Sequence, residues 1–384
     1  MIVTIEDLRK QARRRLPRAV FDYIDGGAED ERTLAENRAA FARVTFRPRV
    51  LVNVGTIDQS TTLYGQRLAS PLVLAPTGLC GMAVARGELL AARAAVKTGV
   101  LFTAATLSAV SLEEIMRQAP APHWFQLYVF RDRALTDSLV ERAQAAGYGA
   151  LVVTADVPVA GQRERDLRNG ATIPPKITLR NAFDSALKLR WLLTLARDPW
   201  IDFVNLRDPT KGTRQGAFTL GSYVNGQFDP TFDWHDLERL RSRWQGTLAL
   251  KGVLTAEDAR RATECGVNAV IVSNHGGRQL DGVPSALEAL PEVVEAVRGQ
   301  ADVILDGGVR RGSDVVKAVA LGARACMIGR SYLYGLGATG QAGAERAIQI
   351  LQSEIARVLA LLGRPRLTDL DRSCLRLPPD WLPG

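Results

Sequence analysis

Eight short apolar runs, alternating with segments of helical pattern, constrain the fold of this chain more than any other feature of its sequence. The runs are LVLAPTG (72–78), VLFTAAT (100–106), HWFQLYV (123–129), ALVVTAD (150–156), TLALKGV (247–253), AVIVSNHG (269–276), VILDGGV (303–309) and ACMIGRS (325–331). Near-continuous apolar runs are typical of strands buried on both faces of a parallel sheet. Eight such strands with helical connections predict an α/β protein with a (β/α)8 TIM barrel, and a doubly wound sheet is the alternative.

The segments between the runs carry helix signals. SLEE (111–114) and TAED (255–258) are capping-box patterns, and Gly147 and Gly266 stand where glycine ends a helix. Two segments lie outside the repeat: an N-terminal helical extension, residues 1–70, and an insertion after strand four, about 157–246. Since no low-complexity tract marks a linker, we expect residues 1–384 to form a single domain.

Composition narrows the classes of function. No apolar run reaches the roughly 18 residues that a membrane span needs, and MIVTIEDLRKQARRR lacks the apolar stretch of a secretory signal. The four cysteines are far apart without a C-x-x-C pair, which argues against a metal site or a disulfide framework. The net charge of +8 suggests anionic partners, but 6% aromatic residues and no basic–aromatic stripe argue against nucleic acid. We expect a globular protein of a reducing cytoplasm.

Polar side chains follow the predicted strands, at the end where TIM barrels carry their chemistry. They are Thr77 and Gly78, Gln126 and Tyr128, Thr154 and Asp156, Lys251, Ser273 and His275, Asp306, and Gly329 and Arg330. So many polar and charged groups at one barrel mouth would be costly to desolvate without a ligand.

Two of these strand ends are suited to phosphate. DGGVRRG and IGRS combine glycines, whose backbone N–H groups can approach a phosphate, with arginines. No strand–helix turn carries the G-x-G-x-x-G pattern of a Rossmann nicotinamide site. Thr77, Gln126, Thr154, Lys251 and Ser273 suit a flat polar heterocycle across the barrel mouth. Lys251 has two interpretations: a Schiff-base lysine of an aldolase-type barrel, or a cation that balances negative charge on a reduced flavin ring.

His275 is the candidate general base, because histidine titrates near neutral pH. His123 and His235 are expected to be structural or exposed. Asp156 would orient His275 and stabilise its protonated form. Arg163 and Arg278 can bind a carboxylate through their planar guanidinium groups.

The segments SNHGGRQLDG, WFQLYV, DGGVRRG, GQRERD and DYIDGGAEDE resemble the FMN-dependent 2-hydroxy-acid oxidases and dehydrogenases over nearly the whole chain. The resemblance implies His275 as the base, Asp156 as its partner, Tyr128 beside the substrate hydroxyl, and Arg163, Arg278 and Tyr23 around the substrate carboxylate. The resemblance also implies that Lys251 and Tyr128 are catalytic residues. For FMN it implies Pro76, Thr77, Gly78, Gln126, Thr154, Lys251, Ser273, Asp306, Gly308, Arg310, Gly329 and Arg330. It leaves open whether the substrate carbon loses its hydrogen as a proton or as a hydride.

Finer expectations rest on single positions. Leu107 and Ala160 leave space for a mandelate-like or other bulky substrate, with lactate as the alternative. Because several oxidases of the family carry alanine where this chain has Gly78, the resemblance implies a dehydrogenase that passes electrons to a membrane quinone. The alternative is a soluble oxidase that makes hydrogen peroxide. Ala105 stands where some members carry a serine that bonds the flavin, and Thr106 could replace it.

The insertion predicts a peripheral membrane contact through residues of about 177–214. Between Lys176 and Arg214 the chain holds eight basic and four acidic residues, a net charge of +4. The same segment carries Trp191, Trp200, Phe183, Phe203 and the run WLLTLA, a mixture that suits the headgroup interface. An active-site lid is the alternative. We expect the protein at the cytoplasmic side of the cell membrane, or in the cytoplasm, and the resemblance implies a homo-oligomer, specifically a tetramer.

Overall fold

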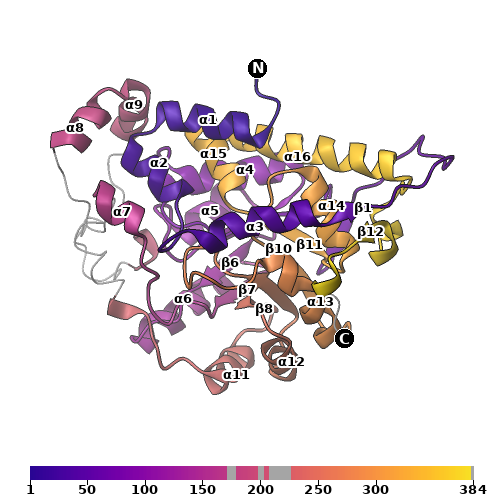
Figure 1. The fold of residues 1–384 in the computed structure, drawn as a ribbon. Coiled ribbons are helices and arrows are strands. Elements are labelled where there is room, and N and C mark those ends of the chain that lie inside the picture. Colours follow the sequence, from indigo (N-terminus) through magenta and orange to yellow (C-terminus); the bar gives the residue numbers. More distant parts are fainter. Residues whose placement is uncertain (171–178, 198–202, 207–225, 382–384) are drawn as a thin grey trace.

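Eight parallel strands close into a barrel at the centre of the molecule (Figure 1). The computed structural model describes residues 1–170, 179–197, 203–206 and 226–381. The barrel strands are β4 (Leu72–Leu74), β5 (Leu101–Ala105), β6 (Trp124–Leu127), β7 (Ala150–Thr154), β8 (Thr247–Val253), β9 (Ala269–Ser273), β10 (Asp302–Asp306) and β11 (Ala325–Ile328). They pair in chain order, and β11 closes the barrel onto β4. The predicted (β/α)8 barrel is confirmed, and the doubly wound alternative is wrong.

Helices surround the barrel and follow its strands. They are α4 (Gly87–Thr98), α5 (Leu112–Gln118), α6 (Arg133–Ala145), α11 (Trp234–Arg243), α12 (Ala256–Glu264), α13 (Ala286–Val297), α14 (Gly312–Ala320), α15 (Arg330–Thr339) and α16 (Gln341–Leu362). The Ser111 hydroxyl accepts from the backbone N–H of Glu114, and Gly147 and Gly266 have φ of +84° and +74° just past the ends of α6 and α12. The predicted helix starts and stops are therefore confirmed at these positions.

Side chains on the two faces of the strands form two cores. Val73, Trp124, Ile271, Ile304 and Met327 belong to the cluster inside the barrel, and the larger cluster lies between the barrel and its helices. Burial of each such side chain contributes about 1.5–3 kcal/mol. Because both strand faces are buried, the strands lack polar alternation, which is why the sequence shows continuous apolar runs.

The N-terminal extension contributes residues to both ends of the barrel. It contains α1 (Ile5–Arg15), α2 (Arg18–Asp25), α3 (Arg32–Arg43), β1 (Thr45–Phe46), β2 (Thr61–Leu63) and β3 (Gln66–Leu68). Leu63 and Leu68 of the β2–β3 hairpin join the core inside the barrel. Helix α1 packs on α15, while β1 pairs with β12 (Leu375–Arg376) near the C-terminus. Short 3-10 helices complete the chain: η1 (Cys80–Met82), η3 (Leu367–Asp369), η4 (Arg372–Cys374) and η5 (Pro379–Trp381).

The insertion between β7 and β8 adds further helices before α11: α7 (Glu164–Asn169), α8 (Leu179–Ala186), α9 (Leu189–Arg197) and η2 (Val204–Leu206). Helices α8 and α9 lie beside α1 and α2 at the upper left of Figure 1. Their exposed side chains include Phe183, Leu189 and Leu193, and Leu187 between the two helices is also exposed. In the described part of the chain, no helix is both long and apolar enough to cross a membrane.

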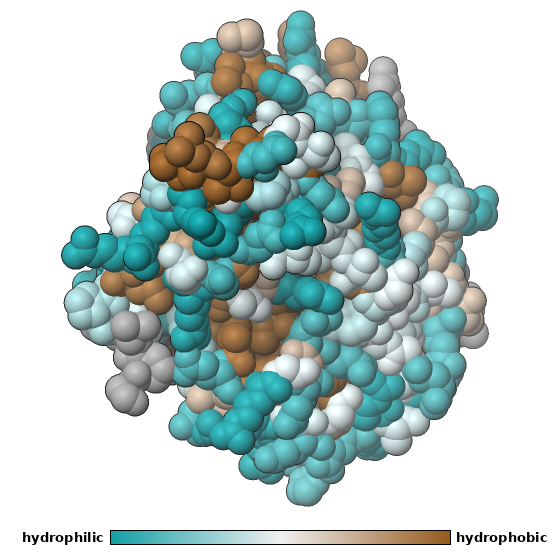
Figure 2. Space-filling model, turned by 90° about the vertical axis from the view of Figure 1, so that its right-hand side faces the viewer, coloured by the Kyte–Doolittle hydropathy of each residue, from teal (hydrophilic) through white to brown (hydrophobic). Residues whose placement is uncertain are grey.

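A second exposed apolar site is the loop after β1, which projects to the right in Figure 1. Val50 and Leu51 are 84% and 103% exposed there. Figure 2 looks onto this side of the molecule and shows a hydrophobic patch on an otherwise mostly hydrophilic face. Val50 and Leu51 lie far in the sequence from the exposed apolar residues of α8 and α9.

Candidate active site

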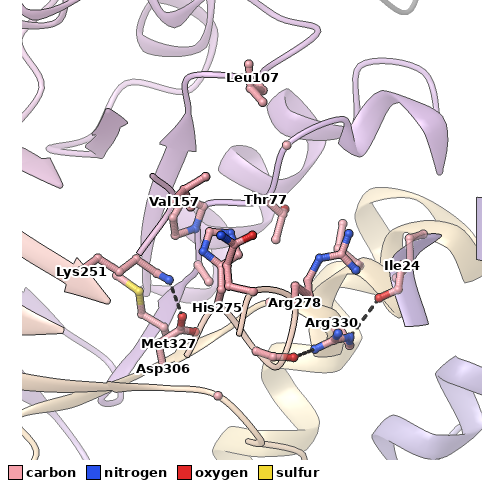
Figure 3. A pocket seen from close by; sticks show the side chains of 18 of the residues that line it. Ile24, Thr77, Leu107, Val157, Lys251, His275, Arg278, Asp306, Met327 and Arg330 are labelled. Carbon is pink, nitrogen blue, oxygen red and sulfur yellow. Dashed lines mark hydrogen bonds and ion pairs between the residues drawn. The ribbon is translucent and has the colours of Figure 1, made fainter. Parts of the chain in front are cut away.

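One cavity lies at the C-terminal ends of the barrel strands, where the sequence predicted the functional residues (Figure 3). Most of the predicted site residues line it: Tyr23, Pro76, Thr77, Gly78, Tyr128, Arg163, Lys251, His275, Arg278, Asp306, Gly308, Arg310, Gly329 and Arg330. Helix α2 of the extension contributes Tyr23, and the insertion contributes Arg163 at the start of α7. Segments far apart in the sequence therefore meet in one site.

Four predicted residues, Gln126, Thr154, Ser273 and Asp156, do not line this cavity. The Gln126 amide donates to the Thr154 hydroxyl over 2.9 Å, and both residues are buried at neighbouring strand ends. Ser273 lies between two lining residues, because its hydroxyl donates to Asp306 Oδ2 (2.7 Å) and accepts from Lys251 Nζ (2.9 Å). These hydroxyl and amide groups form the polar layer directly behind the lining residues.

His275 is oriented by Asp156. Its Nδ1 lies 3.0 Å from Asp156 Oδ1, and its Nε2 lies 3.4 Å from the Tyr128 hydroxyl. Burial opposes ionisation of Asp156, but the charge and hydrogen bond of His275 and the charge of Lys251 lower its pKa. Since an ionised carboxylate only accepts hydrogen bonds, Nδ1 carries the proton and Nε2 is left to accept one. This is the arrangement of a general base beside a hydroxyl group.

A left-handed backbone follows β9 and accounts for the glycine pair after the histidine. His275, Gly276 and Gly277 have φ of +57°, +65° and +73°. A Cβ at Gly277 would lie 2.6 Å from the backbone nitrogen of Leu34, and one at Gly276 would lie 2.9 Å from Arg330. The backbone contact requires glycine at Gly277, and the positive φ favours glycine at Gly276. His275 itself carries the backbone strain that is common at functional sites.

Two guanidinium groups meet at Tyr23. Arg278 lies 5.0 Å and Arg163 lies 5.6 Å from the centre of its ring. Arg278 also donates from Nη1 to the backbone carbonyls of Tyr23 and Gly26. Burial and the nearby charge of Arg163 lower the pKa of Arg278. Two like charges at a cavity wall favour an anion between them, and a planar guanidinium group binds a carboxylate through two parallel bonds.

Lys251 is fully buried and paired. Its Nζ lies 2.8 Å from Asp306 Oδ2. Although burial opposes the charged form, Asp306 and Asp156 raise the pKa of Lys251. A Schiff-base lysine needs a neutral amine and hence a lowered pKa. The site therefore favours Lys251 as a permanent cation beside an electron-rich ring over the aldolase interpretation.

The glycine-rich strand ends fit a phosphate. Gly307 and Gly308 have φ of +135° and +77°, and a Cβ at Gly308 would lie 1.9 Å from the carbonyl oxygen of Asn37. Gly329 is the N-cap of α15, whose first backbone N–H groups and helix dipole attract anions. Arg310 lines the same part of the cavity. Together with the buried donors behind the lining residues, this cradle fits FMN.

Arg330 differs from the simple expectation of a phosphate-binding side chain. Its Nε, Nη1 and Nη2 donate to the carbonyls of Ile24, Gly276 and Gly26 over 2.7–3.0 Å (Figure 3). The guanidinium group therefore links the N-terminal extension to the loop after β9 through these hydrogen bonds. The backbone N–H of Arg330, in the first turn of α15, is the part suited to a phosphate.

Several lining residues escaped prediction. Phe203, Phe228 and Val157 come from the insertion, where no periodic pattern marks them. Gln279 also lines the cavity and donates to the carbonyls of Asp156 and Val159, which holds the loop after β7. The one available signal was the adjacency of Gln279 to Arg278.

Two hydroxyl groups near the cavity bond differently from expectation. The Thr106 hydroxyl donates to the carbonyl of Gln126 (2.6 Å) and accepts from the N–H of Tyr128 (3.1 Å). These bonds to β6 occupy the group that was suggested as a flavin partner. The Thr77 hydroxyl bonds the buried Tyr332 hydroxyl and the Cys80 thiol.

Comparison with known proteins agrees with this site. The model of the FMN-dependent dehydrogenase family matches residues 12–377. An L-lactate oxidase of Nostoc sp. is 45% identical over 98% of both chains, and an L-lactate dehydrogenase of Caulobacter vibrioides is 43% identical over 98% of both. A crystal structure of the monotopic membrane protein (S)-mandelate dehydrogenase is 40% identical, with a TM-score of 0.93 over 98% of this chain and 100% of the other.

Proposed function

Since this chain belongs to the FMN-dependent dehydrogenases, a family of 2-hydroxy-acid oxidoreductases, we propose that it oxidises an L-2-hydroxy acid to the 2-oxo acid and passes the electrons to a quinone-type membrane acceptor. The observation that carries the proposal is the His275–Asp156 pair, which faces one cavity with Tyr128 and the two guanidinium groups at Tyr23. The L configuration is supported by the names of the relatives, which are L-lactate and (S)-mandelate enzymes.

The chain's own residues supply binding and proton transfer. Arg163, Arg278 and Tyr23 hold the substrate carboxylate, and this places the substrate hydroxyl near Tyr128 and His275. Oxidation to the 2-oxo acid removes two electrons and two protons. When bound, FMN would accept the two electrons and the remaining hydrogen. Nε2 of His275 takes one substrate proton, and Asp156 stabilises the resulting imidazolium, whichever of the two substrate hydrogens leaves first.

We expect a substrate larger than glycolate. Leu107, Ala160, Val157, Phe203 and Phe228 form the apolar part of the cavity lining, which suits an aromatic or branched side chain. A panel of glycolate, L-lactate and L-mandelate tests this expectation, and the highest kcat/KM should belong to L-mandelate or a similar bulky acid, with lactate second. Glycolate as the best substrate would contradict it.

The family resemblance favours a quinone-type acceptor over oxygen, because the dehydrogenases carry glycine where several oxidases carry alanine, and this chain has Gly78 at that position. A Cβ at Gly78 would lie 3.2 Å from the carbonyl oxygen and 3.3 Å from the Cβ of Leu107, so a methyl group there would be crowded. The relatives include both an oxidase and a dehydrogenase, so oxygen is the second candidate. The test compares turnover with a quinone-like dye and turnover with dissolved oxygen. Equal rates, with one peroxide per turnover, would assign the protein as an oxidase.

The insertion supports a peripheral contact at the cytoplasmic side of the membrane. Helices α8 and α9 expose apolar side chains beside the basic residues Lys188 and Arg190, and the mandelate dehydrogenase of similar structure is described as monotopic. Residues 177–178, 198–202 and 207–214 of the expected contact, Trp200 included, lie outside the described residues. Phe203 of the insertion lines the cavity, which supports the alternative role of the insertion as an active-site lid.

Flotation with vesicles that contain anionic lipid tests the contact. Leu189→Ser/Leu193→Ser, or deletion of residues 177–214, should release the protein from the vesicles. The control variant Val50→Ser/Leu51→Ser removes apolar groups elsewhere that are more exposed than Leu189 and Leu193, and it should leave binding unchanged. A wild-type protein that fails to float at low salt contradicts the membrane assignment.

We further propose a single domain and a homotetramer, which sedimentation of the holoenzyme tests.

A further inference from the structure

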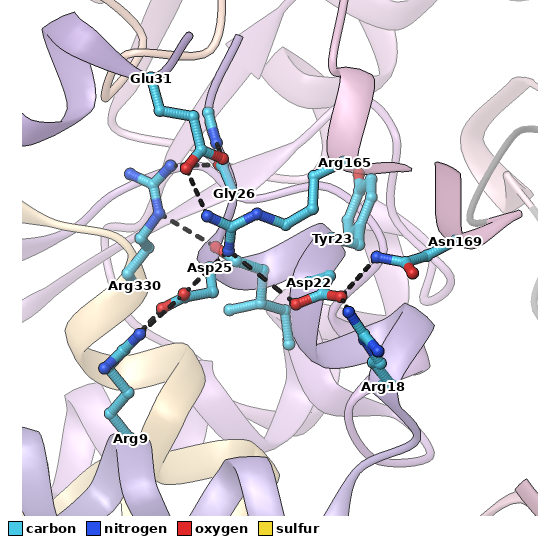
Figure 4. A network of polar contacts seen from close by, with 12 residues as sticks. Arg9, Arg18, Asp22, Tyr23, Asp25, Gly26, Glu31, Arg165, Asn169 and Arg330 are labelled. Atoms are coloured by element: carbon cyan, nitrogen blue, oxygen red, sulfur yellow. Dashed lines mark hydrogen bonds and ion pairs between the residues drawn. The ribbon is translucent and has the colours of Figure 1, made fainter. Parts of the chain in front are cut away.

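Arg165 of helix α7 joins three acidic residues of the N-terminal extension (Figure 4). Its Nη1 lies 3.2 Å from Asp25 Oδ2 and 3.9 Å from Asp22 Oδ1, and its Nη2 binds the Glu31 carboxylate. Glu31 in turn accepts from the backbone N–H of Gly27, 2.9 Å away. One side chain of the insertion therefore holds both the end of α2 and the loop that follows it.

Asp25 is a fixed point in this network. Arg9 binds it with two parallel bonds of 2.6 and 2.9 Å, and the Tyr334 hydroxyl donates to it over 2.7 Å. Burial opposes ionisation, but these hydrogen bonds and the charges of Arg9 and Arg165 lower the pKa of Asp25 to about 2. Asp25 is therefore an anion anchored to α1 and α15, and Arg165 attaches α7 to that anchor.

The two helices that Arg165 joins also carry two of the groups expected to hold the substrate carboxylate. Tyr23 lies two positions before Asp25 on α2, and Arg163 lies two positions before Arg165 at the start of α7. Arg163 rests over the ring of Tyr23 at 5.6 Å. A small movement of α7 relative to α2 would therefore separate Arg163 from Tyr23 and Arg278.

A second side chain of α7 also binds α2. Asn169 at its end donates to Asp22 Oδ2 over 2.5 Å. Arg168, in contrast, is 76% exposed and pairs only with Glu164 of the same helix among the described ion pairs. Arg165 is the charged connection between α7 and the extension nearest to Arg163, and no role in substrate contact or proton transfer accounts for it.

We propose that Arg165 is a positioning residue, which fixes Arg163 against Tyr23 through Asp25 and Glu31 and thereby sets the affinity for the substrate carboxylate. The inference rests on the proposed function, because it assumes that Arg163, Arg278 and Tyr23 bind that carboxylate. Since Asp25 keeps Arg9 and Tyr334 when Arg165 is removed, we expect α2 to stay in place while α7 is released.

The test measures KM, kcat and inhibition by the 2-oxo acid product in the FMN-loaded Arg165→Gln enzyme. KM and the product inhibition constant should both rise about tenfold, while kcat stays within about threefold and the flavin spectrum is unchanged. Arg165→Lys, which keeps the charge but cannot bind two carboxylates at once, should recover part of the affinity. Arg168→Gln on the same helix is the matched control and should leave all three constants unchanged.

A double-mutant cycle identifies the route of the effect. Glu31→Gln should raise KM less than Arg165→Gln does, and the double variant should show less than the sum of the two effects, because both remove one connection. The inference is overturned if Arg165→Gln binds substrate and product as the wild type does, or if kcat and KM change together with a loss of flavin. If instead the wild-type holoenzyme oxidises no 2-hydroxy acid, the proposed function fails, and no Arg165 variant is needed to show it.

Discussion

Nδ1 of His275 lies 3.0 Å from Oδ1 of Asp156, although 119 positions separate the two residues in the sequence. The pair forms because β7 and β9 flank β8 in the barrel, so that the loops after these strands meet at one end. This contact fixes the orientation of the imidazole ring, so that Nε2 points toward the Tyr128 hydroxyl in the cavity lining. The proposed chemistry depends on this orientation.

Replacement of His275 by glutamine should remove the base and retain the cofactor. Turnover should fall by about 10²–10⁴-fold, the range that general base catalysis contributes. The measurement is kcat of the purified variant together with its flavin content. His235→Gln is the control, because His235 is exposed and pairs only with Glu238 among the described ion pairs. Near-wild-type turnover in His275→Gln would remove that residue from its role.

Asp156→Asn should be nearly as damaging, although it leaves the size of the side chain unchanged. An amide can donate to Nδ1, which places the imidazole proton on Nε2 and blocks that atom as an acceptor. We therefore expect kcat to fall by at least about 10²-fold with little change in KM, since no carboxylate-binding group is altered. Unchanged kcat in a folded, FMN-loaded variant would show that Asp156 does not orient the base.

The pH dependence of the stability of Asp25→Asn tests whether ionised Asp25 anchors the extension. The pKa of Asp25 is lowered from 3.8 to about 2, so its ionisation stabilises the fold above the unfolded-state pKa, and this stability is lost as the pH falls toward 2. The shift corresponds to about 2 kcal/mol. Urea unfolding should show Asp25→Asn less stable at pH 7 by about that amount or more, with a smaller difference at pH 3.

The control for this comparison is Asp30→Asn, which alters a carboxylate that is 72% exposed and pairs with an exposed arginine. It should unfold like the wild type at both pH values. The stability difference between Asp25→Asn and the wild type should shrink as the pH falls. A difference that grows instead would contradict this prediction.

Gly308→Ala should weaken both the fold and flavin retention. The new Cβ would lie 1.9 Å from the carbonyl oxygen of Asn37, and φ is +77°, so strain and a backbone collision act together. Gly65→Ala is the matched control, because Gly65 has φ +81° and nothing within 4 Å of the built Cβ. It should cost about 1 kcal/mol of folding free energy. If Gly308→Ala lowers Tm no more than Gly65→Ala and keeps a full complement of FMN, the cradle interpretation is wrong.

The barrel could be predicted from sequence because a strand that is buried on both faces appears as a near-continuous apolar run. Seven of the eight predicted runs contain a whole barrel strand, and the run at 303–309 contains β10 except for its first residue, Asp302. The polar residues after the runs face one cavity or lie directly behind it. The His275–Asp156 pair followed from the same logic, since parallel strands end at a common edge.

The remaining features depend on tertiary contacts that have no local signature. Phe203 and Phe228 reach the cavity from an insertion without a periodic pattern. Arg330 was expected at a phosphate, and only the folded chain shows that three carbonyls occupy its guanidinium group. The network of Arg165 joins elements 134 and 140 positions apart, at Glu31 and Asp25, a separation at which charge pairing cannot be inferred from one sequence.

The most direct test of the central claim is anaerobic mixing of the FMN-loaded enzyme with L-mandelate in the absence of any acceptor. We predict that the absorbance of the oxidised flavin disappears and that one equivalent of the 2-oxo acid forms per flavin, with the same reaction much slower in His275→Gln. The account is contradicted if the flavin stays oxidised with L-mandelate, L-lactate and every other L-2-hydroxy acid of the panel.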